Sequence, residues 1–132
     1  MSCLGMAIVA ELKNLNRDLY DIFIKLPNFG KDHHSGPFSS LEVVKEFPLT
    51  LLNDDKLYEG EWKLCGKKIH GWGIMIKNKN RAIYSGWFKD GQALGYGRIV
   101  YENGTVYTGD FFQGWPSGNG ICTYADGAKY SG

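Results

Sequence analysis

The amino-acid sequence predicts a mainly β protein with an N-terminal helical segment, in which the β part is an elongated antiparallel meander of hairpins. Three observations lead to this fold class. The 132 residues include 18 Gly with 4 Trp, 8 Tyr and 7 Phe, a composition that favours short strands and tight turns. A Tyr-x-Gly-x-aromatic motif recurs in the second half of the chain, and apolar residues recur at helical spacing before Pro27.

Composition and charge exclude several classes of protein. The net charge of +1 excludes a protein that coats a polyanion. The cysteines Cys3, Cys65 and Cys122 form neither a disulfide framework nor a CxxC pair, which favours a reducing, intracellular setting. The sequence has no signal peptide and no apolar run of the roughly 18 residues needed to span a bilayer. We therefore expect a soluble, cytoplasmic protein.

The first element expected is an amphipathic helix that ends before Pro27. Its apolar residues are spaced 4, 3, 4, 3 and 4 apart, with polar residues between them: Ile8, Leu12, Leu15, Leu19, Ile22 and Leu26. We expect this helix to lie on the sheet of its own domain. The same spacing also fits a short heptad seam, so a homo-oligomer formed through the N-terminal helix remains an alternative.

A loop, a short helix and an edge strand are expected next. Asn28 to Pro37 has the composition of a loop. Ser39 to Glu42 has the form of a capping box, which predicts a short helix through Glu46. Leu49–Leu52 is expected to be an edge strand with Pro48 at its start, where proline is tolerated.

The motif Tyr-x-Gly-x-aromatic then starts three times, at Tyr58, Tyr84 and Tyr107, and each copy leads into a Gly-x-Gly pair. In a strand the Tyr, the Gly and the aromatic residue point to one face, and the small Gly lets neighbouring rings lie across the backbone. Dipeptides such as Asp90-Gly91 and Asn103-Gly104 predict tight turns between the strands. A fourth copy starts at Tyr130 and stops at Gly132, which suggests a fragment or a chain that continues into further repeats.

This pattern resembles the MORN repeat (membrane occupation and recognition nexus) from Leu57 to Gly132. The expected division is an N-terminal helical segment and loop, 1–47, and a MORN-repeat sheet, 48–132. That sheet holds three copies, a truncated fourth and a degenerate half-repeat before them. The resemblance implies an elongated antiparallel meander of MORN hairpins and a non-enzymatic scaffold or adaptor in cytoskeletal, ciliary or membrane-associated assemblies. A regulatory N-terminal part of a larger enzyme is an alternative.

The expected binding site is a groove of stacked aromatic side chains that receives a peptide or a helix of a partner protein. Its residues are Tyr58, Trp62, Tyr84, Phe88, Tyr101, Tyr107, Phe111 and Tyr124. The alternative is that these rings only stack with one another. Because the rings are expected to be engaged in the sheet face, nucleic acid is not an expected partner.

A second candidate function is recognition of acidic phospholipids by a local excess of basic residues. The candidates are Lys67, Lys68, Lys77, Lys79 and Arg81. No catalytic constellation, metal site or cofactor motif is found. His70 is expected to be a turn residue, and Asp32, His33 and His34 lack a further ligand at a suitable distance.

The face opposite the tyrosines is unexpectedly apolar for a solvated surface. Its apolar residues are Ile74, Ile76, Trp87, Val100 and Ile121. An apolar face of this size must be covered. The expected cover is the N-terminal helix, and the alternative is a partner.

Overall fold

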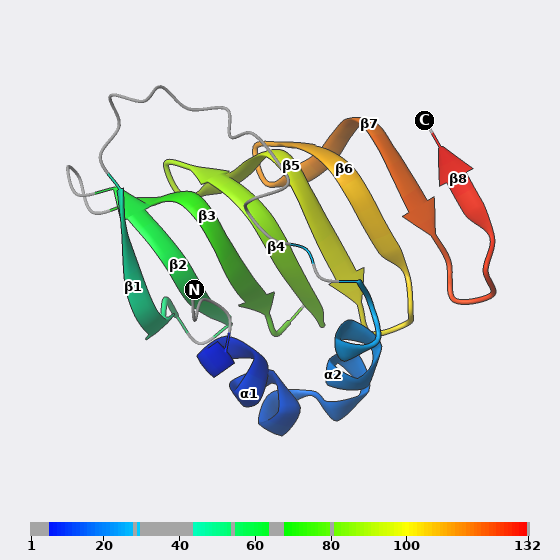
Figure 1. The fold of residues 1–132 in the computed structure, drawn as a ribbon, viewed down its shortest axis with the longest axis horizontal. Helices are drawn as coiled ribbons and strands as arrows, with labels where there is room; N and C mark the ends of the chain where they lie inside the picture. Colours follow the sequence, from blue (N-terminus) through cyan, green and yellow to red (C-terminus); the bar gives the residue numbers. More distant parts are fainter. Residues whose placement is uncertain are drawn as a thin grey trace.

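The computed structural model describes residues 6–27, 29, 44–53, 55–63, 68–79 and 81–131. Within these residues, eight strands form one open antiparallel sheet in which each strand pairs with the next (Figure 1). This confirms the predicted mainly β meander with an N-terminal helical segment. The strands are β1 (Val44–Leu51), β2 (Lys56–Lys63), β3 (Lys68–Lys77), β4 (Ala82–Lys89), β5 (Gln92–Tyr101), β6 (Val106–Phe112), β7 (Trp115–Thr123) and β8 (Lys129–Ser131).

A row of directly opposed glycines crosses the sheet and holds the repeats in register. One glycine comes from each of six successive strands: Gly60, Gly73, Gly86, Gly97, Gly109 and Gly120. Because paired residues of an antiparallel sheet share a face, this register places Tyr58, Tyr84 and Tyr107 on the same side. We call this side the tyrosine face and the opposite side the helix face.

Tight turns close the hairpins where the sequence predicts them. Asp90 and Gly91 join β4 to β5 with φ angles of 48° and 92°, and Gln113 and Gly114 join β6 to β7 with 51° and 87°. Two successive residues with positive φ form the turn whose twist matches that of the flanking strands.

The prediction of a single N-terminal helix is wrong in one respect, because a break at Asn16 divides the helical segment into two helices. Helix α1 spans Met6–Leu15 and helix α2 spans Arg17–Ile24. Asn16 has extended backbone angles, and its side-chain oxygen accepts a hydrogen bond from the Leu19 N–H at 3.1 Å. Asn16 therefore caps a new helix. Neither of the two helices is long and apolar enough to cross a membrane.

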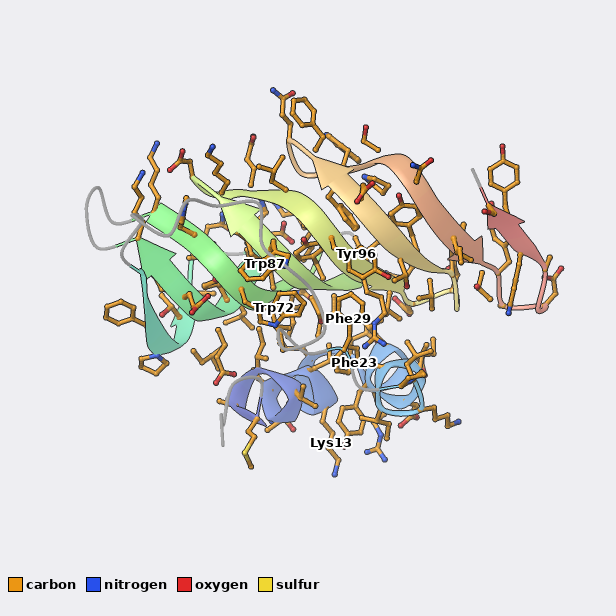
Figure 2. All side chains as sticks on the ribbon, turned by 45° about the horizontal axis from the view of Figure 1, so that its top comes forward. Lys13, Phe23, Phe29, Trp72, Trp87 and Tyr96 are labelled. Atoms are coloured by element: carbon orange, nitrogen blue, oxygen red, sulfur yellow. The ribbon has the colours of Figure 1, made fainter. Side chains whose placement is uncertain are left out.

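The two helices cover the helix face of the sheet, as expected (Figures 1 and 2). Ile8, Leu12 and Leu19 are buried against three sheet residues, Ile76, Ile83 and Val100, and Ile74 packs at the margin of this cluster. The backbone N–H of Ile8 also donates to the buried Glu59 carboxylate at 2.9 Å, which ties the start of α1 to β2.

The helical cover does not extend to the last strands. Helix α1 packs against β1, β2 and β3, and α2 packs against β5. Ile121 on β7 was expected under the helix, but its side chain is 51% exposed. That expectation is wrong because the two short helices stop before this part of the sheet.

The first strand begins earlier than the sequence indicates. The helix expected through Glu46 is wrong over Val44–Glu46, since these residues form the start of β1 and pair with β2. The predicted edge strand is therefore confirmed but longer. Its pairing shifts between Phe47 and Thr50, around Pro48, whose nitrogen has no hydrogen to donate. The capping box and the loop expected over 28–37, except Phe29, lie outside the described residues.

Candidate functional site

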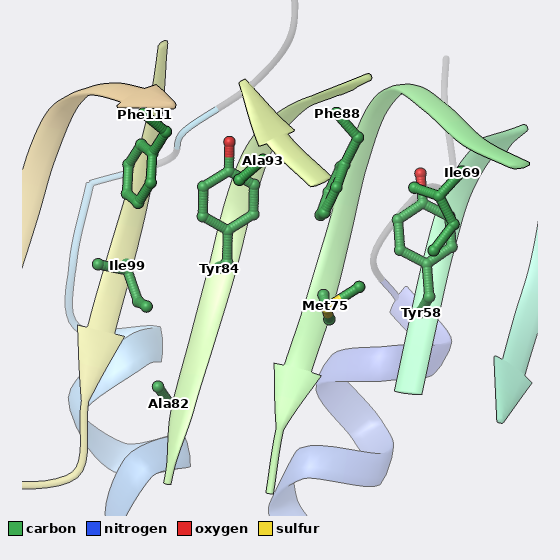
Figure 3. Close-up of a cluster of buried hydrophobic side chains, with 9 residues drawn as sticks. All are labelled: Tyr58, Ile69, Met75, Ala82, Tyr84, Phe88, Ala93, Ile99 and Phe111. Carbon is green, nitrogen blue, oxygen red and sulfur yellow. The ribbon is translucent and has the colours of Figure 1, made fainter. Parts of the chain in front are cut away.

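The aromatic residues of the repeats form a continuous ladder on the tyrosine face, and Figure 3 shows its middle part, Tyr58, Phe88, Tyr84 and Phe111. Successive rings meet edge to face with centroids 4.8 to 5.7 Å apart, an arrangement that aromatic quadrupoles favour. In order along the sheet the ladder consists of Trp62, Tyr58, Phe88, Tyr84, Phe111 and Tyr107.

Each repeat tyrosine bonds back to its own strand. The hydroxyls of Tyr58, Tyr84 and Tyr107 donate to the carbonyl three residues later, at 2.8, 2.8 and 3.0 Å. Burial raises the pKa of Tyr58 and of Tyr84 well above the ordinary value. These hydroxyls stay protonated at neutral pH and their donor capacity is used internally, so they are structural groups.

A tyrosine ring lies directly against the second glycine of each Gly-x-Gly pair. A Cβ added at Gly73 would stand 2.2 Å from the Tyr58 hydroxyl oxygen, and one at Gly97 would stand 2.4 Å from that of Tyr84. The expectation that rings lie across glycine backbone is confirmed.

The structure brings the predicted groove residues together on one face but exposes them unequally. Tyr58, Tyr84, Phe88 and Phe111 are at most 3% exposed, so little of their ring surface is available to a partner. Three others are half-buried, namely Trp62, Tyr101 and Tyr107, and Tyr124 is 46% exposed. Aromatic side chains on the tyrosine face are therefore least accessible in the middle of the sheet, and the C-terminal strands carry the most exposed ones.

Four tyrosines gather around Cys122 at that end of the sheet, and we call them the tyrosine patch: Tyr101, Tyr107, Tyr124 and Tyr130. Cys122 pairs across the strands with Tyr107 on one side and with Tyr130 on the other. Burial raises the pKa of Tyr101, and the Cys122 thiol raises the pKa of Tyr124. The patch offers flat, uncharged and amphipathic side chains, which suit contact with a protein segment.

Sequence reasoning missed three exposed aromatic residues of the C-terminal strands. Tyr130, 67% exposed, completes the patch, whereas Phe112 and Trp115 face each other across the β6–β7 hairpin and are 55% and 72% exposed. Comparison of the repeats could have found Phe112 and Trp115, because they occupy the turn positions that Lys89 and Gln92 occupy one repeat earlier.

The basic residues considered for lipid binding are not brought to one place. Lys68 and Lys77 begin and end β3, about 30 Å apart at 3.3 Å per residue. Burial lowers the pKa of Lys77, and its cross-strand neighbour Lys56 lowers it further. Lys79 and Arg81 follow Lys77 in the next turn, and Lys67 lies outside the described residues.

Two of these basic residues line a polar cleft of about 590 Å³ between the helix junction and the turns of the sheet. Arg17, Lys79 and Arg81 contribute cations, and Glu102 contributes the one carboxylate of the lining. Glu102 accepts a hydrogen bond from the Asn16 side chain at 3.3 Å and pairs with Arg81 at 3.5 Å. The positive charges exceed the negative one, so the cleft attracts anions.

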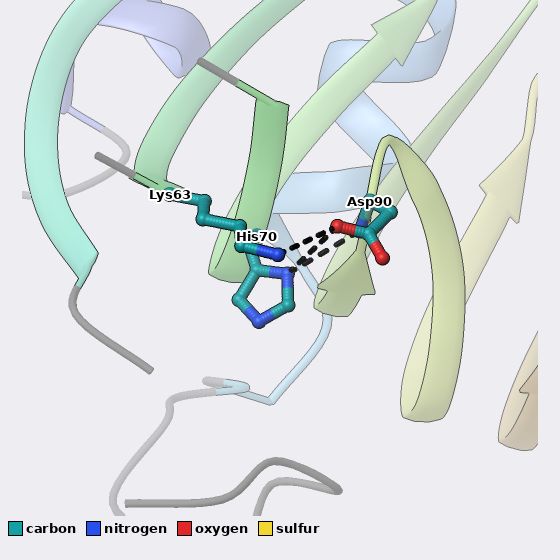
Figure 4. Close-up of polar contacts among 3 residues, drawn as sticks. All are labelled: Lys63, His70 and Asp90. Carbon is teal, nitrogen blue, oxygen red and sulfur yellow. Dashed lines mark hydrogen bonds and ion pairs between the residues drawn. The ribbon is translucent and has the colours of Figure 1, made fainter. Parts of the chain in front are cut away.

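A separate polar contact joins Lys63, His70 and Asp90 (Figure 4). His70, expected in a turn, lies fully buried in β3, and its Nδ1 accepts the backbone N–H of Asp90 at 3.3 Å. Lys63 pairs with the Asp90 carboxylate at 3.3 Å. This contact lowers the pKa of Asp90 below its ordinary value, and His70 lowers it by a smaller amount. Within the described residues, His, Cys, Asp and Glu nowhere form a group that could hold a metal ion.

These features define an open sheet built from copies of one hairpin unit. The family model for the MORN repeat matches residues 84–106 and 107–129, whose starts coincide with Tyr84 and Tyr107. Residues 84–129 are therefore MORN repeats, which belong to a family that is typically non-catalytic. The hairpin that starts at Tyr58 has the same tyrosine geometry. No curated protein matches the chain.

Proposed function

We propose that this protein is a non-enzymatic scaffold that binds a segment of a partner protein on its tyrosine patch. The observation that carries the proposal is the exposure of Tyr124 and Tyr130 next to the half-buried Tyr101 and Tyr107. Large aromatic surface that is left accessible beside a buried ladder supplies binding energy without requiring the sheet to rearrange.

The middle of the ladder has a different role in this proposal. Tyr84 and Phe111 hold the strands in a fixed arrangement, so the patch is presented on a rigid support. A partner segment must supply flat apolar groups for the rings and hydrogen-bond acceptors for the hydroxyls of the exposed tyrosines. A peptide or a helix of another protein provides both.

The test is a pull-down with the full chain from cells that express it, followed by quantitative mass spectrometry. Tyr124→Ala with Tyr130→Ala should remove the proteins that the wild type recovers. The matched control is Phe112→Ala with Trp115→Ala, which changes exposed aromatics at the same end of the sheet on the opposite face. Partners retained by the tyrosine variant and lost by the control would contradict the proposal.

We further propose a cytoplasmic location in a cytoskeletal, ciliary or membrane-associated assembly, because proteins with similar repeats serve there. Imaging of the tagged full-length protein tests this, and a diffuse signal with no enrichment at any of these structures would count against it. Sedimentation of the pure protein tests the accompanying alternative of a homo-oligomer through the N-terminal helices, which requires a concentration-dependent mass.

Recognition of acidic phospholipid is the second candidate, favoured by the cations that line the polar cleft. Vesicles of phosphatidylcholine with added phosphatidylserine should bind the protein in a salt-sensitive manner, and vesicles without it should not. Lys79→Glu with Arg81→Glu should abolish this binding, whereas Lys68→Glu at the other end of β3 should leave it largely intact. Equal loss in both variants would argue against the cleft as the lipid site.

A further inference from the structure

The helix face carries an aromatic slot that is built from three neighbouring strands, one ring from each (Figure 2). Its members are Trp72 on β3, Trp87 on β4 and Tyr96 on β5. Trp72 and Trp87 are cross-strand partners and meet edge to face at 5.2 Å. Both are nearly fully buried.

Phe29 of the same chain occupies this slot. Its ring stacks on Trp72 at 5.7 Å with an interplanar angle of 25°, and on Tyr96 at 5.6 Å with an angle of 17°. A single side chain that follows the helices therefore contacts rings from two non-adjacent strands. Phe29 itself remains half-buried, so the occupant lies at the surface of the slot.

The Arg98 side chain binds the main chain of the segment that carries Phe29. Its guanidinium donates to the Pro27 carbonyl oxygen at 2.7 Å and lies 5.1 Å from the centre of the Phe29 ring. Arg98 is 6% exposed, its Nε has no hydrogen-bond partner among the described residues, and no described carboxylate pairs with it. A main-chain carbonyl is present in every peptide, so this contact recognises the main chain rather than one particular side chain.

The residues that form this site differ from those at the equivalent positions of the other repeat copies. The position after the Gly-x-Gly pair is Ile74 in the first copy and Ile121 in the third, but Arg98 in the second. Trp87 likewise replaces an acidic residue, since the equivalent positions are Glu61 and Asp110. Regular sheet structure forms without these residues in the other copies, so the repeat fold does not require them.

We propose that the aromatic slot with Arg98 is a docking site for an extended segment of another protein that carries a phenylalanine two residues after an accepting carbonyl. Phe29 occupies the site in cis and competes with that segment. Because the guanidinium stands beside the bound ring, a neutral or acidic segment fits and a basic one is disfavoured. This surface is separate from the tyrosine patch.

Release of the occupant does not require loss of the helices. Helix α2 ends at Ile24, before Pro27, and the helices are held by their own buried residues, such as Leu12 and Leu19. Exchange of Phe29 for a segment of a partner therefore leaves these buried helix contacts in place.

The test uses the full chain and a blocked peptide with the sequence Leu-Pro-Asn-Phe-Gly, that of residues 26–30. Isothermal titration should show that Phe29→Ala binds this peptide at least tenfold more tightly than the wild type. The same peptide with Ala in place of Phe should not bind either protein. Adding Tyr96→Ala to Phe29→Ala should abolish binding, and the matched control Phe29→Ala with Phe112→Ala should keep it.

Circular dichroism must show that each variant retains the fold. Equal peptide affinity for Phe29→Ala and the wild type, or no binding by a folded Phe29→Ala protein, would overturn the proposal. If Phe29→Ala does not fold, Phe29→Leu keeps apolar packing without the stacked ring and takes its place. Unfolding of both variants would make Phe29 a core residue of the domain and would equally overturn the proposal.

Discussion

Substitution of Gly86 by alanine tests whether the glycine row is required by close packing of strands and rings. A Cβ at this position would stand 2.6 Å from the Gly97 Cα, 2.6 Å from the Tyr84 hydroxyl oxygen and 2.8 Å from the Tyr96 carbonyl oxygen. Two of these three atoms belong to backbone of the neighbouring strand, so the collision cannot be relieved by rotation of a flexible side chain.

The magnitude follows from two effects. Forcing a methyl group into a packed site costs about 1–3 kcal/mol. Displacing Tyr84 also weakens the hydrogen bond from its hydroxyl to Trp87, worth about 1 kcal/mol net. We expect a loss of about 3 kcal/mol, which lowers the Tm by roughly 12 °C at roughly 4 °C per kcal/mol for a domain of this size.

The control is Gly91→Ala in the β4–β5 turn, where an added Cβ would meet no atom within 4 Å. At φ of 92° this change costs only the backbone strain of a non-glycine residue, about 1 kcal/mol or roughly 4 °C. Thermal melts followed by circular dichroism compare the two. Equal losses in Tm would refute the close-packing explanation, because both variants would then report only the conformational preference of glycine.

Three further predictions concern the helices and the ladder. Leu19→Ala should lower the free energy of unfolding in a denaturant melt by about 2–5 kcal/mol, because Leu19 is 1% exposed. Leu15→Ala should lower it far less, because Leu15 is 42% exposed. The reverse order would contradict the described helix packing. Asn16→Ala removes the cap of α2 and should lower the free energy of unfolding by about 1 kcal/mol with a loss of helical circular dichroism; an unchanged spectrum and melt would show that the cap is not needed. The raised pKa of Tyr58 and Tyr84 predicts a loss of stability at alkaline pH, since the folded state keeps protons that the unfolded chain releases near 10.0. This contribution is fully present below pH 10.0 and declines above it, so tyrosinate absorbance should appear together with unfolding, and ionisation of these tyrosines without unfolding would count against their burial.

The strand pattern of the candidate site could be predicted because it is local. Tyr58, Tyr84 and Tyr107 each lie near the start of a strand in which every second residue shares a face, and that alternation follows from backbone geometry alone. The turn at Asp90 and Gly91 was equally predictable, since few residues adopt a positive φ at low cost. The break at Asn16 was not predicted, because the apolar spacing continues through it while the side chain of one residue caps a second helix.

Accessibility could not be predicted in the same way, because it depends on atoms from other strands. Tyr84 and Tyr130 start identical Tyr-Ser-Gly sequences, yet they are 1% and 67% exposed. Tyr84 lies between Phe88 and Phe111, which come from its own strand and from a strand two positions along the sheet. The basic residues show the same limit, since Lys68 and Lys77, which belong to one basic stretch of the sequence, lie at opposite ends of β3.

The sequence by itself determined the repeat, its turns and the face on which each side chain lies, since these depend on residues within a few positions of one another. Only the tertiary structure decided where the helices stop on the sheet and which segment reaches the slot of Trp72 and Tyr96. Phe29 is separated from both residues by the whole of β1 and β2. Contacts between such distant parts of the chain depend on how all the intervening elements pack, and no local pattern in the sequence records that packing.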